Sequence, residues 1–315
     1  MPIPRFSSPS RAPWRGFALL LVCSGLLMAV AACGGDSSPI DPNAPDEVLF
    51  QDGLTAYNVP DYVTAQAKFD ELVQKFPDSP RRDNAAYLAG RCRYELTDYN
   101  GAITTLMQMR ELYPTSPFFH SAAYFTGRSR YQLNDFTGAK ADFQAALQAD
   151  PQGVFADNAQ YFVGRCLYEL GDLPGAAAEL TKAETAYPAS SYVDNVRYYL
   201  GRSYFDRKDY ASAVGPFERV FQTAGSIYAD DAQYYLGRCH YGLTQLPNAL
   251  TDFKGVVTTY AASQYVDNAL YYEVRIYADQ NNCASANATY TELQTKFPAS
   301  PYLSQAQTYK AGKGC

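Results

Sequence analysis

The chain has 315 residues, of which 47% are hydrophobic, 15% aromatic and only 18% charged. This composition excludes an intrinsically disordered chain, because disordered chains are poor in aromatic residues and rich in charge. The formal net charge is −6, and a net acidic protein is a poor binder of phosphate backbones. We therefore expect a folded protein that has no nucleic-acid partner.

The N-terminal segment has the features of an export signal. Arg5, Arg11 and Arg15 give it a positive start, it holds no acidic residue, and an apolar run that ends at Ala32 follows. A cleaved signal peptide has this order of positive charge, apolar stretch and small residues. Residues 1–32 are therefore predicted to be a signal peptide, whose removal would take the formal charge from −6 to −9.

The end of this segment, from Val30 to Cys33, reads Val-Ala-Ala-Cys and resembles the bacterial lipobox. The resemblance implies cleavage just before Cys33 and attachment of a diacylglyceryl group to its thiol. Two or more acyl chains anchor a protein stably, at about 0.8 kcal/mol per buried CH₂. Gly34 follows, where an Asp would retain many lipoproteins in the inner membrane, so the resemblance implies the outer membrane. The alternatives are a secretory signal that happens to contain a cysteine, or an uncleaved membrane helix.

A short polar tether is predicted after the anchor. Residues 33–46 are rich in Gly, Ser, Asp and Pro. Fully extended, this segment would reach about 45 Å. It would therefore keep the folded part, predicted over 47–315, close to the membrane.

A repeat of 37 residues, shortened once to 36, occupies this folded part. Glycine marks it at Gly53, Gly90, Gly127, Gly164, Gly201 and Gly237, and Val274 takes the next place. An alanine stands twelve residues later, at Ala65, Ala102, Ala139, Ala176, Ala213, Ala249 and Ala286. A large apolar residue stands sixteen later, at Phe69, Leu106, Phe143, Leu180, Phe217, Phe253 and Tyr290. A repeat with such a period indicates stacked supersecondary units.

Each unit reads as two helices. In the second unit the first helix is predicted from about Asp83 to Leu96, because its apolar residues have helical spacing. Acidic residues suited to cap the second helix occur at Asp61, Asp98, Asp135, Asp172 and Asp209. Proline ends the second helix at Pro77, Pro114, Pro151, Pro188 and Pro298. Glycine inside a helix costs roughly 1 kcal/mol relative to alanine, so we expect the repeat glycines to allow close approach of two helices.

This pattern of Gly, Ala, large apolar residue and Pro resembles the tetratricopeptide repeat. The exits, such as Phe76-Pro77-Asp78-Ser79 and Phe297-Pro298-Ala299-Ser300, are similar to those of the BamD and YbgF/CpoB lipoprotein families. The resemblance implies an all-α fold: a right-handed solenoid of about seven tetratricopeptide-like helix-turn-helix units with a C-terminal capping helix. Two features depart from BamD, namely the seven units and the arginine after the repeat glycine.

The resemblance also implies a function. Proteins of these families are lipid-anchored scaffolds that face the periplasm and bind protein partners. The expected partners are components of outer-membrane barrel or secretin assembly, and the expected process is envelope assembly such as outer-membrane protein insertion. The alternative is a pilotin or adaptor lipoprotein of a secretin, pilus, motility or Tol-Pal/cell-wall complex.

Arginine follows the repeat glycine directly in five units, and Arg275 takes the same place after Val274 in the seventh. Aromatic residues lie four positions before it and three positions after it, so all three fall on one stripe of the first helix. The candidate peptide-binding residues are Tyr87, Arg91, Tyr94, Tyr124, Arg128, Tyr131, Tyr161, Arg165, Tyr168, Tyr198, Arg202, Tyr234, Arg238 and Tyr241. In this family the stripe lines the concave groove where extended peptides bind.

Two hypotheses fit the arginines. In the first, they hold an acidic or aromatic segment by charge-assisted hydrogen bonds and stacking. In the second, each pairs with an acidic neighbour and joins adjacent units. The acidic neighbours in question are Glu95, Glu169, Asp206 and Asp267. Both hypotheses stay open at the level of the sequence.

The cysteines of the repeat part fall into two sorts. Cys92, Cys166 and Cys239 share one repeat position in alternate units, too far apart for disulfides, and are predicted to be buried thiols. Cys283 and Cys315 break the pattern. A capping helix over about 301–310 would bring Cys315 near Cys283, and in an oxidising periplasm the two are predicted to form a disulfide.

We find no constellation that would carry catalysis. The chain has only two histidines, His120 and His240. The adjacent Cys239 and His240 do not have a metal-ligand spacing, since neighbours point apart on a helix. No phosphate loop or nucleophile elbow occurs. We expect a protein that is not an enzyme and has no cofactor, metal or small-molecule substrate.

Overall fold

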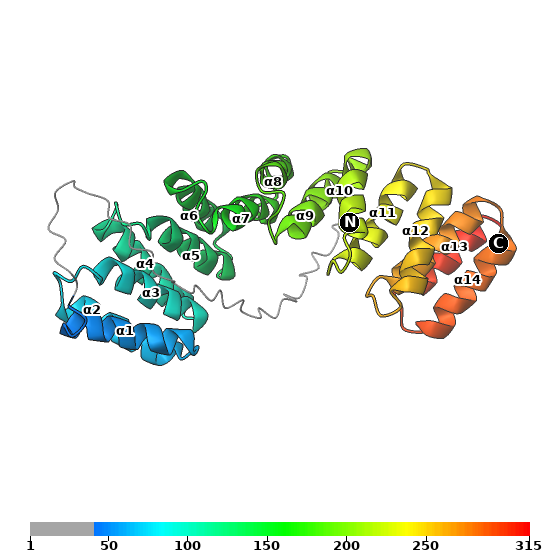
Figure 1. The fold of residues 1–315 in the computed structure, drawn as a ribbon. Coiled ribbons are helices and arrows are strands. Elements are labelled where there is room, and N and C mark those ends of the chain that lie inside the picture. The colour runs from blue at the N-terminus through cyan, green and yellow to red at the C-terminus, as the bar shows by residue number, and fades with distance from the viewer. Residues whose placement is uncertain (1–40) are drawn as a thin grey trace. The chain divides into compact units, whose positions relative to one another are not determined.

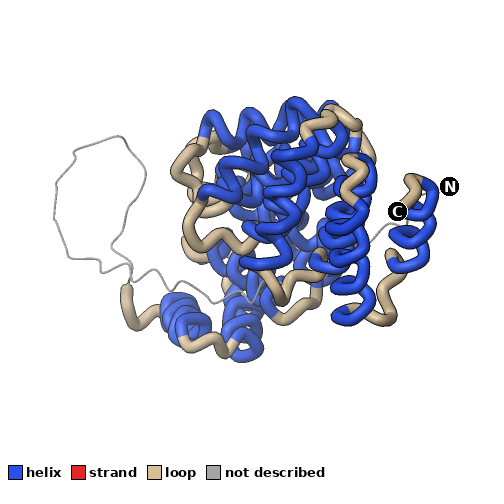
Figure 2. Tube along the Cα trace, turned by 90° about the vertical axis from the view of Figure 1, so that its right-hand side faces the viewer, coloured by secondary structure: helices blue, strands red, loops and turns tan. Residues whose placement is uncertain are grey.

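The computed structural model describes residues 41–315, so the predicted signal peptide 1–32 and lipidation site Cys33 lie outside the described residues. This part holds fifteen α-helices and no strand (Figures 1 and 2). The helices are α1 (Pro45–Asn58), α2 (Tyr62–Lys75), α3 (Arg82–Glu95), α4 (Tyr99–Leu112), α5 (Phe119–Gln132), α6 (Phe136–Ala149), α7 (Ala156–Glu169), α8 (Leu173–Ala186), α9 (Val193–Asp206), α10 (Tyr210–Gln222), α11 (Ala229–Gly242), α12 (Leu246–Thr259), α13 (Val266–Asp279), α14 (Cys283–Lys296) and α15 (Leu303–Gly312).

Seven helix pairs, α1/α2 to α13/α14, follow one another along the chain, and α15 packs on the last pair (Figure 1). Helix contacts run mainly between neighbours in sequence, as a stack of repeats requires. The predicted all-α solenoid with a terminal capping helix is confirmed. The first helix begins at Pro45, two residues inside the segment predicted as a tether.

The repeat glycine and the large apolar residue sixteen positions later meet inside each of the first six pairs. A Cβ added to Gly90 would lie 2.5 Å from Leu106, and one added to Gly164 would lie 2.6 Å from Leu180. The same is true of Gly53 with Phe69, Gly127 with Phe143, Gly201 with Phe217 and Gly237 with Phe253. The predicted close approach is confirmed: only a residue without a side chain leaves room for the facing ring or leucine.

The seventh pair is built differently because Val274 replaces the glycine. Val274 is fully buried, and the matching Tyr290 is only partly buried. The Nζ of Lys310 in α15 lies 5.0 Å from the centre of the Tyr290 ring. The valine side chain thus displaces the aromatic ring, which packs on the capping helix instead.

A side chain caps the N-terminus of the second helix in most pairs. The predicted caps Asp61, Asp98, Asp135, Asp172 and Asp209 each accept a hydrogen bond from the backbone N–H three residues on. Such caps contribute about 1 kcal/mol each. The sixth pair has Gln245 at this place, and its side chain makes no capping bond.

A serine in the turn between units binds the preceding unit. Ser116 Oγ donates to Asp83 Oδ2 at 2.6 Å, and Ser190 and Ser300 make the same bond to Asp157 and Asp267. Ser79 donates to Asp46 in the first unit. The exit motif Pro-x-Ser and the Asp at the start of the first helix are therefore two halves of one contact between units. In the third unit both halves change together, because His120 replaces the Asp and Gly153 the Ser.

Substitution of Gly164 by Ala tests the close approach. The added Cβ would meet Leu180 at 2.6 Å and its backbone N at 3.3 Å. We expect Gly164→Ala to lower the free energy of unfolding by about 1–3 kcal/mol, although alanine is the better helix former. Gly312→Ala is the control, since its Cβ would meet nothing within 4 Å. Urea denaturation followed by circular dichroism measures both, and equal effects would contradict the packing argument.

One buried carboxyl group has no hydrogen-bond partner for one of its oxygens. Glu273 in α13 is 5% exposed, and its Oε1 bonds to nothing in the described part of the chain. Burial raises the pKa of Glu273 from 4.5 to about 7, while Lys254 of α12 opposes the shift and Glu292 of α14 adds to it. The folded protein thus favours the protonated acid, and this contribution to stability is present below pH 4.5 and is lost as the pH rises from 4.5 to about 7.

Replacement of Glu273 by Gln is expected to stabilise the protein at pH 8 and to change little at pH 4. The shift of the pKa of Glu273 from 4.5 to about 7 lowers the free energy of unfolding at pH 8 by about 3 kcal/mol. Thermal melting at the two pH values measures the difference. Glu218→Gln, at an exposed position, is the charge-matched control; a gain for Glu273→Gln that is the same at both pH values would disprove the assignment.

Candidate functional site

The predicted arginine and tyrosine residues form one connected row along the first helices of the pairs; we call this row the stripe. Each arginine lies between aromatic rings of the units before and after it. The guanidinium of Arg202 lies 5.7 Å from the Tyr168 ring centre and 4.7 Å from that of Tyr235. That of Arg238 lies 5.3 Å from Phe205 and 4.9 Å from Tyr272. One arginine therefore connects three consecutive units.

The other stripe arginines repeat this geometry. Arg91 lies between Tyr57 and Phe125, Arg128 between Tyr94 and Phe162, and Arg275 between Tyr241 and Tyr309 of the capping helix. Arg165 donates to Tyr131 at 3.1 Å and lies 3.5 Å from the Tyr199 ring centre. Partly desolvated contacts of this kind contribute about 0.5–2 kcal/mol each.

Hydrogen bonds within each helix fix the orientation of the guanidinium groups. Arg128, Arg202, Arg238 and Arg275 each donate to the hydroxyl of the tyrosine four residues earlier, at 2.8, 3.1, 2.7 and 3.4 Å. The acceptors are Tyr124, Tyr198, Tyr234 and Tyr271. Burial raises the pKa of Tyr94 and Tyr131 to about 12, so these stripe hydroxyls stay protonated at neutral pH.

The acidic neighbours of the arginines do not join adjacent units through them. Glu95, Glu169 and Asp206 pair with the arginine four residues earlier in the same helix, at 4.0, 2.6 and 3.4 Å. Asp267 accepts from Ser300 and forms no ion pair among the described residues. Aromatic rings, rather than carboxylates, therefore carry the contacts of the arginines between units.

Two aromatic rows of this surface were missed at the level of the sequence. The first precedes the first helix of the next unit, as Phe118, Phe155, Tyr192, Tyr228, Tyr265 and Tyr302. Its rings pack on the stripe tyrosines, for example Tyr265 on Tyr234 at 4.3 Å and 9°. The second row, Phe125, Phe162, Tyr199, Tyr235 and Tyr272, receives the arginines of the preceding unit. Both rows have the repeat period, so the same search for recurring residues would have found them.

A polar residue seven positions before each arginine completes the surface. Asn195 Nδ2 donates to the Tyr228 hydroxyl and Asn268 Nδ2 to that of Tyr302, both at 2.8 Å. The stripe thus combines guanidinium, hydroxyl and amide groups on a rigid backbone. It can offer a bound chain aromatic surface and several hydrogen-bonding groups, but it has no activated nucleophile or acid–base pair.

Comparisons with known proteins agree with this array of stacked helix pairs. Residues 42–152 match the model of the YfiO family, described as outer membrane lipoprotein. Residues 124–191 and 231–263 match two models of the tetratricopeptide repeat. The chain is a tetratricopeptide-repeat protein similar to outer membrane lipoproteins. No curated protein gives a significant match to its sequence.

Solved structures share the fold of this tetratricopeptide array. The C-terminal part of a repeat protein from Cytophaga hutchinsonii is 18% identical, with a TM-score of 0.67 over 82% of this chain and 98% of that one. The apo form of RapI is 12% identical, with a TM-score of 0.62 over 86% and 82%. The structure of pilF of Pseudomonas aeruginosa is 17% identical, with a TM-score of 0.51 over 72% of this chain and 96% of that one. At these identities the likeness concerns the fold alone.

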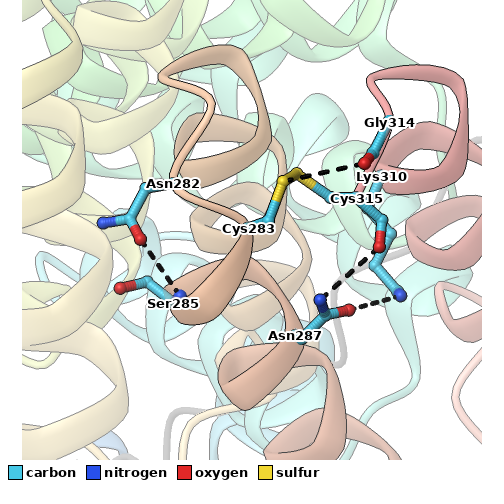
Figure 3. Close-up of a disulfide and its surroundings, with 7 residues drawn as sticks. All are labelled: Asn282, Cys283, Ser285, Asn287, Lys310, Gly314 and Cys315. Carbon is cyan, nitrogen blue, oxygen red and sulfur yellow. Dashed lines mark hydrogen bonds between the residues drawn. A yellow bond between two sulfur atoms is a disulfide. The ribbon is translucent and has the colours of Figure 1, made fainter.

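The cysteines of the array lie in two environments. Cys92, Cys166 and Cys239 are free and fully buried, and burial raises the pKa of each thiol to about 12. Thiols in this state are poor nucleophiles. In the capping region Cys283 and Cys315 are joined in a disulfide (Figure 3). Beside it Lys310 Nζ donates to Asn287 Oδ1 at 2.6 Å, so the end of α15 is fixed on α14 by two kinds of contact.

Neither a metal centre nor a membrane span is present in residues 41–315. Among these residues, no three His, Cys, Asp or Glu side chains are grouped so that they could hold a metal ion. Within the same range, every helix is too short or too polar to cross a bilayer.

Peptide mapping of the non-reduced protein tests the disulfide. We expect the peptides that contain Cys283 and Cys315 to be linked, and Cys92, Cys166 and Cys239 to be alkylated only after unfolding. The bridge spans 32 residues, so its removal in Cys283→Ser/Cys315→Ser should cost about 3 kcal/mol. Urea denaturation measures this loss. Two alkylatable thiols at 283 and 315 in the native protein would contradict the bridge.

Proposed function

We propose that this protein is a non-enzymatic scaffold, anchored to the outer membrane through Cys33 and facing the periplasm, that binds protein partners during envelope assembly. The match of residues 42–152 to the outer membrane lipoprotein model carries this proposal. The stripe supports it, because a long row of partly exposed arginines and tyrosines on a rigid array suits an extended partner segment. The partners fitting this role best are components that insert outer-membrane barrels.

The binding surface in this proposal is the stripe over the middle pairs, from α5 to α11. There Arg128 is buried, whereas Arg165 and Arg202 expose 15% and 21% of the side chain. A bound segment would meet the remaining guanidinium surface together with the hydroxyls of Tyr131 and Tyr168. Because the same arginines also join units, their removal would disturb folding as well as binding, and a test by alanine substitution alone would confuse the two.

Site-specific photo-crosslinking avoids this difficulty. We expect a photoreactive residue at position 132, which is exposed at the end of α5 and occupies the same repeat position as Glu95 and Glu169, to capture a partner in intact cells. The matched control is position 185, exposed on α8 away from the stripe. Equal capture at both positions, or capture only at 185, would refute the stripe as the binding surface.

Depletion of the protein tests the process it serves. Loss of folded outer-membrane barrels, measured by their heat-modifiable migration in gels, is the expected result. Normal barrels with one missing pilus or secretin would instead identify a pilotin or adaptor. Unchanged barrels and appendages would refute both forms of the proposal.

A further inference from the structure

One edge of the array carries a row of exposed apolar side chains. This edge consists of the turns that join the two helices of each pair, and we call it the turn edge. Six residues after the repeat glycine, the first four units hold an apolar residue: Val59 (69% exposed), Leu96 (37%), Leu133 (43%) and Leu170 (45%). First helices of successive units pack about 10 Å apart, so the four side chains follow one another in a row.

The turn does not require an apolar residue at this position. Each turn is closed by a backbone hydrogen bond, for example from the N–H of Asp98 to the carbonyl oxygen of Arg93 at 2.9 Å. The fifth and seventh units close the same turn with Arg207 and Gln280 in the place of the leucines. The exposed apolar row therefore needs an explanation other than the fold, and contiguous exposed apolar surface is typical of interaction sites.

The same four turns are acidic. They comprise residues 58–61, 95–98, 132–135 and 169–172, which contain six Asp and Glu residues and no Lys, Arg or His. In the fifth turn, by contrast, Arg207 and Lys208 balance the charges of Asp206 and Asp209. The surface that combines apolar and acidic residues thus covers units 1 to 4 and ends at unit 5.

Half of the six carboxylates have no counter-charge. Those of Glu95, Asp135 and Glu169 lie within 4.0 Å of an arginine of the preceding helix. The other three accept a backbone N–H as helix caps and take part in no ion pair among residues 41–315: Asp61, Asp98 and Asp172. All three are exposed. A basic partner would therefore meet negative charge that the chain itself does not neutralise.

We propose that the turn edge of units 1 to 4 docks a partner segment that has an apolar residue at every third position and arginine or lysine between these residues. This inference rests on the proposed function and names the chemistry of the partner. An extended segment rises about 3.3 Å per residue, so every third side chain would reach the next apolar residue of the row. The basic side chains between them would pair with the carboxylates, which gives the contact its specificity.

A lipid surface suits the turn edge less well. Anionic headgroups attract basic segments, and these four turns hold none. The described chain also starts at the opposite edge: Asp46, at the beginning of α1, accepts from Ser79 of the exit turn. Helix α1 is about 20 Å long, so the predicted tether to Cys33 leaves the array about one helix length away from Val59.

The apolar row is tested with a fluorescent dodecapeptide of the repeat Leu-Arg-Ala, acetylated and amidated. Its binding to the full-length mature lipoprotein in nanodiscs is measured by fluorescence anisotropy at physiological salt, with empty nanodiscs as the blank. We expect the triple variant Leu96→Gln/Leu133→Gln/Leu170→Gln to bind the peptide about tenfold more weakly. The fold accepts glutamine there, as Gln280 shows.

The matched control removes three apolar side chains that are exposed elsewhere, namely Leu112 (55%), Val154 (77%) and Ile227 (69%). We expect Leu112→Gln/Val154→Gln/Ile227→Gln to change the affinity by less than about twofold. Equal weakening by the two triple variants, or unchanged affinity for the variant of the turn edge, would overturn the proposal.

The carboxylates are tested by Asp98→Asn/Asp135→Asn/Asp172→Asn. Asparagine keeps the helix caps, because Asn282 caps α14 in the same way and accepts from the N–H of Ser285 at 3.2 Å. We expect about fivefold weaker binding at physiological salt and a smaller loss of affinity as salt is added. Asp78→Asn/Glu111→Gln/Glu218→Gln, at exposed positions outside the four turns, is the control, and the same loss in this control would contradict the charge contact.

A tryptophan at the turn edge distinguishes a partner segment from the membrane. The only tryptophan of the sequence is Trp14, in the predicted signal peptide, so Leu133→Trp gives the mature chain a single indole. We expect the emission of an exposed indole in nanodiscs and a blue shift when the Leu-Arg-Ala peptide is added. Blue-shifted emission without the peptide, quenched by brominated phosphatidylcholine, would show that the edge lies on lipid and would overturn the proposal.

Failure of this inference is distinguishable from failure of the proposed function. If depletion removes folded barrels and position 132 captures a partner, while both variants of the turn edge bind the peptide as the wild type does, the scaffold stands and only the docking surface is wrong. If depletion leaves barrels and appendages unchanged, the proposed function fails whatever the peptide measurements give.

Discussion

A single pair of helices in this protein cannot bury its own apolar faces, and the whole structure depends on that constraint. Each pair must find its missing surface in the neighbours before and after it. The chain meets this requirement by repeating the same contacts at the same positions. The repeat glycine closes the first six pairs, the serine of the exit turn binds the unit before at four junctions, and the arginine binds the units on both sides. The last pair, which has no successor, is completed by α15 and by Tyr309 in place of the next aromatic ring.

The arginines show how one row of residues can serve both the fold and a ligand. Arginine stacks its flat guanidinium group on aromatic rings while its N–H groups donate in a fixed plane, whereas the ammonium group of lysine is compact and has no flat face. In the stripe one face of the guanidinium group lies on a ring of the following unit, and its N–H groups reach a tyrosine or a carboxylate of its own helix. These contacts already occupy much of the guanidinium group. A partner therefore meets a surface of hydroxyls, ring edges and partly covered guanidinium groups rather than a row of free positive charges.

Units that depart slightly from the repeat can give the array its selectivity for a ligand. An array of identical units offers a ligand the same surface many times, so selectivity must come from units that differ. The third unit has His120 and Gly153 in place of the aspartate and the serine, and the seventh holds the buried Glu273. Each of these changes leaves the helix pair intact, because the contacts that close the pair lie on other residues.

The sequence by itself determined the helix pairs, their ends and their internal packing. These features depend on residues near one another in the chain: the capping Asp lies three residues from its N–H, and Gly90 lies sixteen residues from Leu106. Regular spacing was therefore enough to predict them. Only the tertiary structure decided the partners of the arginines, because those partners lie 33 or 34 residues before or after, in the neighbouring units, and depend on how successive pairs stack. Three of the acidic neighbours suggested by the sequence do pair with the arginines, but within one helix, so the aromatic rings of the neighbouring units make the contacts between units.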